Sequence, residues 1–208
     1  MDVIVLGGVF AALRTDLDAS TTLLTSGELG GMATADGPVP VRTLAHAARL
    51  MRDVGQLGRY GIRTSEPTLD YATLLSRQRP GAFDVEKRAG RRRKAIHENA
   101  RPCRFIDGHT VETASGERHS ADKIIVCVGG KARRLTFPGA EHVAIQSDAW
   151  SLQSVPASIL VIGGGATGLQ VASIFAAFGT RVDLFENAIR LLPKEDEDVA
   201  AAVAQEVP

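Results

Sequence analysis

The feature that most constrains the fold is a glycine-rich turn between two apolar segments, "ILVIGGGATGLQVASIFAAFGTRVDLFE" at residues 159–186. The run "ILVI" is typical of a strand in a parallel sheet, and "ATGLQVASIFAAF" has the composition of a buried helix. The segment "RVDLFE" follows as a second strand. A strand, a helix and a strand in this order predict a βαβ unit, and therefore an α/β fold with a parallel sheet.

The glycines of this turn have the spacing of a dinucleotide-binding fingerprint. Gly163, Gly165 and Gly168 occupy its G-x-G-x-x-G positions. The first allows a tight turn, the second a close approach of the pyrophosphate, and the third close packing of helix on strand. Glu186 ends the second strand, where a carboxylate can bond a ribose hydroxyl. This pattern predicts nucleotide binding, and the alternative is a glycine turn kept only for packing.

The rest of the chain supplies a second, weaker pattern of the same kind. The start, "MDVIVLGG", predicts a buried strand that ends at Gly7 and Gly8, but Val9 and Phe10 follow and would crowd a pyrophosphate. Helices are expected from Thr43 to about Leu57 and over "TLDYATLLSRQ". A β-meander, with turns at 107–108 and 115–116, precedes a buried strand at 124–128. A domain boundary is expected near 147–156.

Composition excludes several function classes. Lys and Arg number 24, equal to Asp and Glu, so no globally basic nucleic-acid binder is indicated. The basic run at 87–94 reads as a solvated helix face, with nucleic-acid or partner binding as the alternative. The two cysteines form no close pair and no signal peptide is evident, so we expect a cytoplasmic location without a membrane span. The five histidines are scattered, and no metal site is expected.

Several longer segments resemble the flavin-dependent pyridine nucleotide-disulfide oxidoreductases, the family of dihydrolipoamide dehydrogenase and mercuric reductase. "DVIVLGG" is similar to the family's first FAD-binding strand, "GELGGM" to the loop before its redox cysteines, and "DKIIVCVGGKARRLTFPGAE" to its "ATGS.PR..PGAE" segment. The resemblance implies FAD and NAD as cofactors. It also implies a Rossmann-like FAD-binding domain with a β-meander at 1–150 and the first βαβ portion of a second, NAD(P)-binding Rossmann-like domain at 151–208. The cofactor-binding residues implied or predicted are Gly7, Gly8, Gly30, Gly31, Arg42, Gly129, Gly163, Gly165, Gly168 and Glu186.

The chain departs from the family at its redox centre. Ala33 and Pro38 stand at the two cysteine positions, and Arg42 stands at the position of a lysine. Without thiolates the family's dithiol relay cannot operate, so no catalytic residue is assigned. The resemblance then implies an oxidoreductase that passes hydride from nicotinamide to flavin and on to a diffusible acceptor such as a quinone. Arg42 is expected either to face the flavin as a fixed charge or to be solvated.

Two alternatives to this function remain open. One is a non-catalytic remnant with weak or no cofactor binding, which the altered Gly7 loop favours. The other is nucleic-acid or partner binding through the basic run. Full-length relatives are homodimers, and the end of the sequence at Pro208 leads us to expect that the dimer-forming domain is missing. The partner expected for the first function is a small-molecule electron acceptor.

Overall fold

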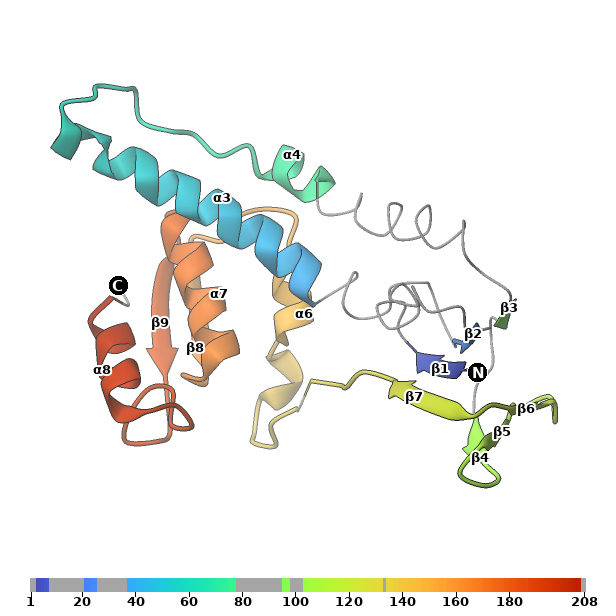
Figure 1. Cartoon of the computed structure of the whole chain (residues 1–208). Coiled ribbons are helices and arrows are strands. Elements are labelled where there is room, and N and C mark those ends of the chain that lie inside the picture. The colour runs from blue at the N-terminus through green and yellow to red at the C-terminus, as the bar shows by residue number, and fades with distance from the viewer. Residues whose placement is uncertain are drawn as a thin grey trace. The chain divides into compact units, whose positions relative to one another are not determined.

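The computed structural model describes residues 3–7, 21–25, 37–77, 95–97, 103–132 and 134–206, with the backbone alone for 95–97. The chain divides into two compact units, and the segments that form each unit are not consecutive. One unit comprises Met1–Val39 and Arg79–Lys131, and the other Pro40–Gln78 and Ala132–Pro208 (Figure 1). These units are defined by packing alone, so the cofactor roles expected for 1–150 and 151–208 stay predictions.

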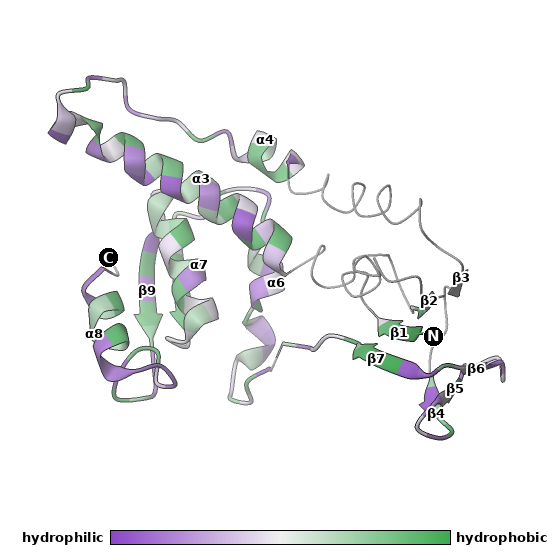
Figure 2. Cartoon of the chain, viewed as in Figure 1, coloured by the Kyte–Doolittle hydropathy of each residue, from purple (hydrophilic) through white to green (hydrophobic). Residues whose placement is uncertain are grey.

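The first unit is built on a parallel sheet. Its strands are β1 (Val3–Gly7), β2 (Thr21–Leu24), β3 (Ala95–His97) and β7 (Lys123–Cys127), in the order β3-β2-β1-β7. All three strand pairs are parallel. The strand predicted at the start of the chain and the parallel α/β class are therefore confirmed. Its buried side chains include Ile4, Leu6 and Leu24, and β1 is uniformly hydrophobic in Figure 2.

The predicted β-meander is present in the same unit. It consists of β4 (Arg104–Phe105), β5 (Thr110–Glu112) and β6 (Arg118–Ser120), paired antiparallel. Glu112 lies on the central strand, opposite a basic residue on each neighbour. Its carboxylate accepts hydrogen bonds from Arg118 Nε at 2.8 Å and Arg104 Nε at 2.9 Å. These bonds, from Arg118 first and then Arg104, lower the pKa of the Glu112 carboxyl.

The prediction for the last strand of this unit is correct in position but wrong in burial. Sequence predicts a buried strand at 124–128, whereas β7 has exposed side chains at Ile125 and Val126, which are 40% and 57% accessible. The reason is topological. In the described sheet β7 pairs with β1 alone and forms the edge, so an apolar composition is not sufficient to bury it.

The second unit contains most of the helices and a short parallel sheet. Helix α3 (Pro38–Gln56) enters it at Pro40 and is followed by η1 (Leu57–Tyr60) and α4 (Tyr71–Ser76). It begins five residues before the predicted start at Thr43, because proline is well suited to the first turn of a helix. Further along the chain come η2 (Ala140–His142), α6 (Gln146–Ala149), β8 (Ser158–Ile162), α7 (Ala166–Ala177), β9 (Arg181–Phe185) and α8 (Glu197–Glu206).

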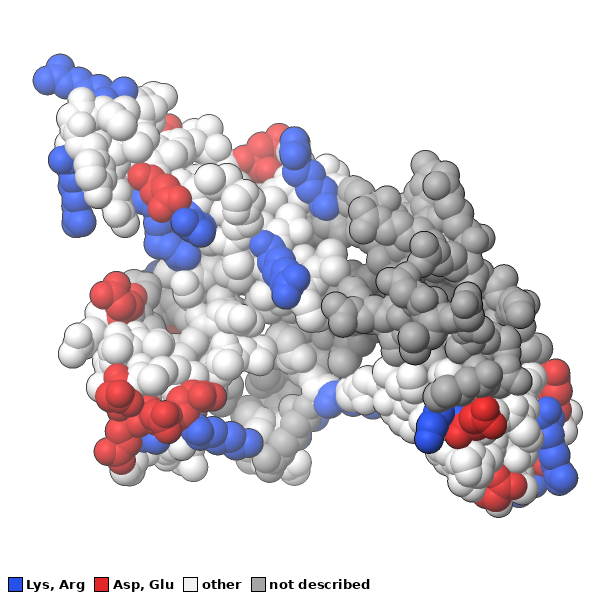
Figure 3. Space-filling model, viewed as in Figure 1, with Lys and Arg blue, Asp and Glu red and all other residues white. Residues whose placement is uncertain are grey.

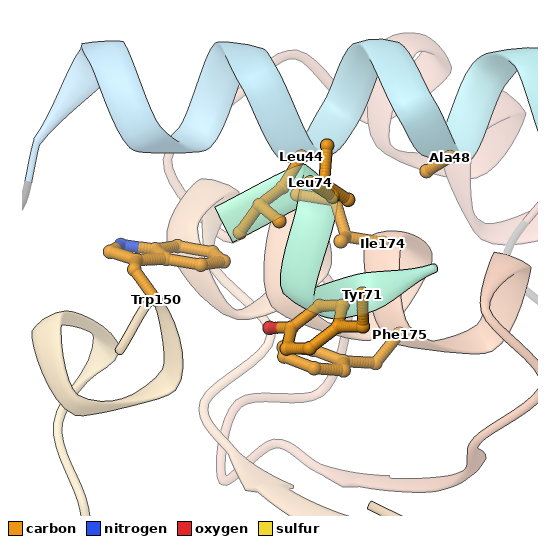
Figure 4. Close-up of a cluster of buried hydrophobic side chains, with 7 residues drawn as sticks. All are labelled: Leu44, Ala48, Tyr71, Leu74, Trp150, Ile174 and Phe175. Atoms are coloured by element: carbon orange, nitrogen blue, oxygen red, sulfur yellow. The ribbon is translucent and has the colours of Figure 1, made fainter. Parts of the chain in front are cut away.

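A single apolar cluster joins these helices. Figure 4 shows side chains from α3, from α4, from α7 and from the end of α6 converging on one centre. Phe175 is fully buried there and makes an edge-to-face contact with Phe178, with ring centroids 6.2 Å apart. The expectation that these two phenylalanines belong to the core is therefore confirmed. The buried members are Leu44, Ala48, Tyr71, Leu74, Trp150, Ile174 and Phe175.

Charge accumulates at the start of the last helix. Figure 3 shows acidic side chains gathered near the start of α8, and Glu197 and Asp198 form the first turn of this helix. Negative charge at this position offsets the partial positive charge of a helix N-terminus. Ala200 is buried within the second unit, while Val199 is 48% exposed.

Candidate functional site

The predicted βαβ unit forms as expected in the second unit. β8 and β9 pair in parallel over five residues, from Ser158 opposite Arg181 to Ile162 opposite Phe185. The Gly163 N–H then donates to the Phe185 carbonyl at 2.7 Å, which continues the ladder by one residue. Helix α7 starts three residues later, with Gly165 as its N-cap. The free N–H groups of this helix therefore face the carboxyl edge of the two strands, the position at which anions are held.

Glycine stands at each fingerprint position for a different structural reason. Gly163 has φ +110°, a conformation that other residues rarely adopt. A Cβ on Gly168 would collide with the Gly163 carbonyl oxygen and lie 3.4 Å from Val161 Cγ1, so helix and strand approach here at backbone contact. Gly165 differs from both, because a Cβ there would meet no atom within 4 Å. The space at Gly165 is open, as an approaching ligand requires.

Glu186 folds back onto the glycine turn. Its Oε2 accepts the Gly164 N–H at 2.6 Å, and its Oε1 accepts the Ala188 N–H at 2.7 Å. The bonds from Ala188 and then Gly164 lower the pKa of the Glu186 carboxyl, so it is ionised at neutral pH. Each carboxylate oxygen retains acceptor capacity for another donor, such as a hydroxyl. The side chain is half-buried beside the turn.

A cavity of about 640 Å³ borders the same turn within the second unit. Its walls come from the segment 134–152, from β8 and from the start of α7, and they are mostly apolar. The described lining contains residues of β8 and α7 but neither Glu186 nor any residue of β9. The residues shared by the cavity and the fingerprint are Gly163, Gly165, Ala166, Thr167 and Gly168.

Arg190, four residues after Glu186, carries a charge that could pair with a cofactor 2′-phosphate, but its guanidinium is bonded elsewhere. Its Nη1 donates to the Leu192 carbonyl at 3.0 Å, and its Nη2 donates to the Glu195 carbonyl at 2.7 Å and the Pro193 carbonyl at 3.5 Å. The guanidinium is therefore engaged by the backbone of its own loop. It is not directed at the ribose position beside Glu186.

The other predicted residues lie on other elements or outside the described residues. Gly7 has φ +96°, and a Cβ there would collide with the Cys127 carbonyl; Gly129 has φ +72°. Both belong to the first unit, and both conformations favour glycine. Arg42 is an exposed residue of α3. Outside the described residues lie Gly8, Val9, Phe10, Gly30, Gly31, Ala33 and the basic run at 87–94.

Sequence reasoning missed the part of the site that follows Glu186. Gly164 is buried, and a Cβ on it would lie 2.5 Å from Leu191 Cδ2. The Gly164 carbonyl also accepts the Leu192 N–H at 2.9 Å. The middle glycine of "GGG", Gly164, was an available signal, since the G-x-G-x-x-G pattern does not require a glycine at its second position.

Two kinds of feature are absent from the described residues. No cluster of three or more His, Cys, Asp or Glu side chains suited to a metal ion occurs among them. No helix in this part of the chain has the length and apolar composition that would let it cross a membrane.

Comparison with known proteins assigns nearly the whole chain to one family. The family profile described as "Pyridine nucleotide-disulphide oxidoreductase" matches residues 1–207. The chain is 30% identical to the dihydrolipoyl dehydrogenase of Zymomonas mobilis over 98% of its length and 47% of the relative's. It is 27% identical to a Bacillus subtilis dihydrolipoyl dehydrogenase, covering 86% of this chain and 41% of the relative. The chain thus spans less than half of these relatives.

A solved structure has a similar fold. The copper(II) complex of the HOCl-induced flavoprotein disulfide reductase RclA from Escherichia coli matches with a TM-score of 0.73. The match covers 100% of this chain and 46% of that protein, at 21% sequence identity. At this identity the likeness bears on the fold alone.

Proposed function

Because the chain belongs to the pyridine nucleotide-disulphide oxidoreductase family, we propose that it is an FAD- and NAD(P)-linked oxidoreductase whose acceptor is a diffusible molecule such as a quinone. In this proposal, residues 151–208 bind the nicotinamide nucleotide and residues 1–150 bind the flavin. The observation that carries it is the turn at Gly163–Gly168 with the ionised Glu186 against it.

The surroundings of the turn support a ligand with two halves. The open space at Gly165, at the start of α7, suits a pyrophosphate. Glu186 offers acceptors to a ribose diol, and the apolar cavity, whose lining does not include Glu186, has room for the second half of a dinucleotide. A mononucleotide would use only one of these two features.

The described residues of the first unit also fit a nucleotide turn. Gly7 ends β1 with positive φ, and a Cβ there would collide with the Cys127 carbonyl of β7. Val9 and Phe10 follow in the sequence and predict weak FAD affinity. When bound, the two cofactors supply hydride transfer from nicotinamide to flavin and electron transfer onward to the acceptor. The chain's own part is to bind and orient them.

The acceptor is proposed from the side chains that replace the family's cysteines. Ala33 and Pro38 offer no sulfur, and Pro38 begins α3. Cys103 lies just before β4, and partial desolvation raises the pKa of its thiol, which disfavours the reactive thiolate. Cys127 ends β7 and is half-buried. Neither takes the place of a dithiol relay.

We expect the FAD-incubated chain to oxidise NADH with a quinone at least about tenfold faster than with lipoamide or glutathione disulfide, because no dithiol can relay electrons to a disulfide. NADH absorbance measures both rates, and the visible spectrum after gel filtration measures retained flavin. Cys103→Ser and Cys127→Ser are matched controls that should leave the quinone rate unchanged. Disulfide reduction as fast as quinone reduction contradicts the proposal. If the chain retains no flavin and does not reduce the quinone, the alternative of a non-catalytic remnant is favoured.

The same site predicts a preference for NAD(H) over NADP(H). The Glu186 carboxylate is ionised and would repel a 2′-phosphate, and Arg190 is occupied by backbone carbonyls. We expect this repulsion to give about a tenfold ratio of dissociation constants in favour of NAD(H). Fluorescence titration with each reduced cofactor measures this ratio.

Glu186→Ala is the variant that tests the assignment, with Glu195→Ala as its control, since Glu195 is an exposed acid of the same segment. The ratio should fall toward one in the first variant and stay near ten in the second. Tighter NADPH binding by the unmodified chain, or an unchanged ratio in Glu186→Ala, refutes Glu186 as the ribose ligand.

A further inference from the structure

We infer that Arg190 is a positioning residue for the nucleotide site: it holds the loop 190–195 against Gly164 and thereby fixes the glycine turn. This inference rests on the proposed nucleotide site, and it gives a role to a side chain that contacts no part of the fingerprint itself. The argument begins with the conformation of the loop that follows Glu186.

The loop 190–195 contains one backbone conformation that is unfavourable for its residue type. Leu192 has φ +48°, the only positive φ of a non-glycine residue in the described part of the chain. A branched side chain makes this conformation unfavourable. Arg190 donates to the carbonyl of Leu192 itself and to that of Glu195 at the end of the loop. Two arms of one planar guanidinium therefore tie the middle of the loop to its end, in a fixed fork geometry that the single ammonium of a lysine does not reproduce.

The loop held in this way contacts the fingerprint at one residue. Leu192 donates its N–H to the Gly164 carbonyl at 2.9 Å. Leu191 Cδ2 lies 2.5 Å from the position that a Gly164 Cβ would take. The loop thus contacts Gly164 in two ways: Leu192 bonds its carbonyl, and Leu191 packs on the side where a Cβ would stand. Glu186 accepts its N–H. Its neighbours Gly163 and Gly165 form the turn proposed to receive the pyrophosphate.

The geometry separates two roles that a nearby arginine can have. An arginine that binds a 2′-phosphate contributes to NADP(H) affinity alone. An arginine that positions the turn contributes to both cofactors equally, because the turn contacts the pyrophosphate that they share. The ratio of the two affinities therefore distinguishes the roles.

The test is titration of NADH and NADPH into Arg190→Met, which keeps the apolar stem and removes the donors. We expect both affinities to fall by about tenfold, with the NADH:NADPH ratio unchanged. Lys194→Met is the matched control, since it removes the neighbouring exposed cation of the same loop, and it should bind both cofactors as the unmodified chain does. Arg190→Lys should recover only part of the loss.

The outcomes separate this inference from the function on which it rests. If the unmodified chain binds no NADH, the proposed function fails. If it binds NADH and Arg190→Met binds equally well, or loses NADPH alone, the positioning role is wrong and the site stands. Emission of the single tryptophan, Trp150, shows whether the Met variant is folded. If it is not, Arg190→Lys decides, and NADH affinity equal to that of the unmodified chain overturns the inference.

Discussion

Replacing Gly168 with alanine should destabilise the second unit by about 2 kcal/mol, because the added methyl meets backbone and not a movable side chain. The Cβ would collide with the Gly163 carbonyl oxygen, and relief requires α7 to move away from β8. Overpacking of this kind costs about 1–3 kcal/mol, and the better helix propensity of alanine offsets up to about 1 kcal/mol. Urea unfolding followed by Trp150 fluorescence measures the change.

Gly165→Ala is the matched control for this substitution. The same methyl there meets nothing within 4 Å, and φ −77° suits alanine. Stability should stay within about 1 kcal/mol of the unmodified chain, while NADH affinity should fall at least about tenfold because the methyl occupies the ligand's space. Equal stability losses in the two variants would mean that the helix and the strand are not in backbone contact at Gly168.

Phe175→Ala should lower the free energy of unfolding by about 3–5 kcal/mol, the range for a large aromatic side chain removed from a packed core. Phe175 is fully buried in a cluster that includes residues of α3 and α4, and it contacts Phe178 edge-to-face. The loss should reach α3 as well as α7, because one cluster joins them. Urea unfolding reported by Trp150 measures it, since that side chain belongs to the same cluster.

The control is Phe185→Ala, which removes the same side chain from the end of β9. Phe185 is 62% exposed, and its removal should change stability by no more than about 0.5 kcal/mol. A loss above 2 kcal/mol at Phe185, or below 1 kcal/mol at Phe175, would show that the core is centred elsewhere.

The local part of the site could be predicted from the sequence. The turn at Gly163, the strands on either side and the acid at Glu186 follow from spacing, because a βαβ unit is made of neighbouring residues whose conformations are set by short-range geometry. The structure confirms the turn and the helix start. The cofactor that they hold stays a prediction.

What depended on distant contacts could not be predicted. The exposure of β7 follows from its place at the sheet edge, which its composition does not encode. The packing of α3 with α7 joins residues more than 100 positions apart, as in the bond from Arg52 to the Ser173 carbonyl at 3.0 Å. The backbone partners of Arg190 were hidden because any carbonyl can accept from a guanidinium, so sequence offers no complementary residue to search for.

The central claim is that the turn at 163–168 and Glu186 hold NAD(H), and amide chemical shifts under NADH titration test it most directly. We expect saturable shifts of Gly163, Gly165, Gly168 and Glu186, whose backbones surround the proposed ligand. The amides of the meander at 110–120 lie in the other unit and should stay unchanged. Saturable shifts confined to other residues, or none at millimolar NADH, would contradict the account.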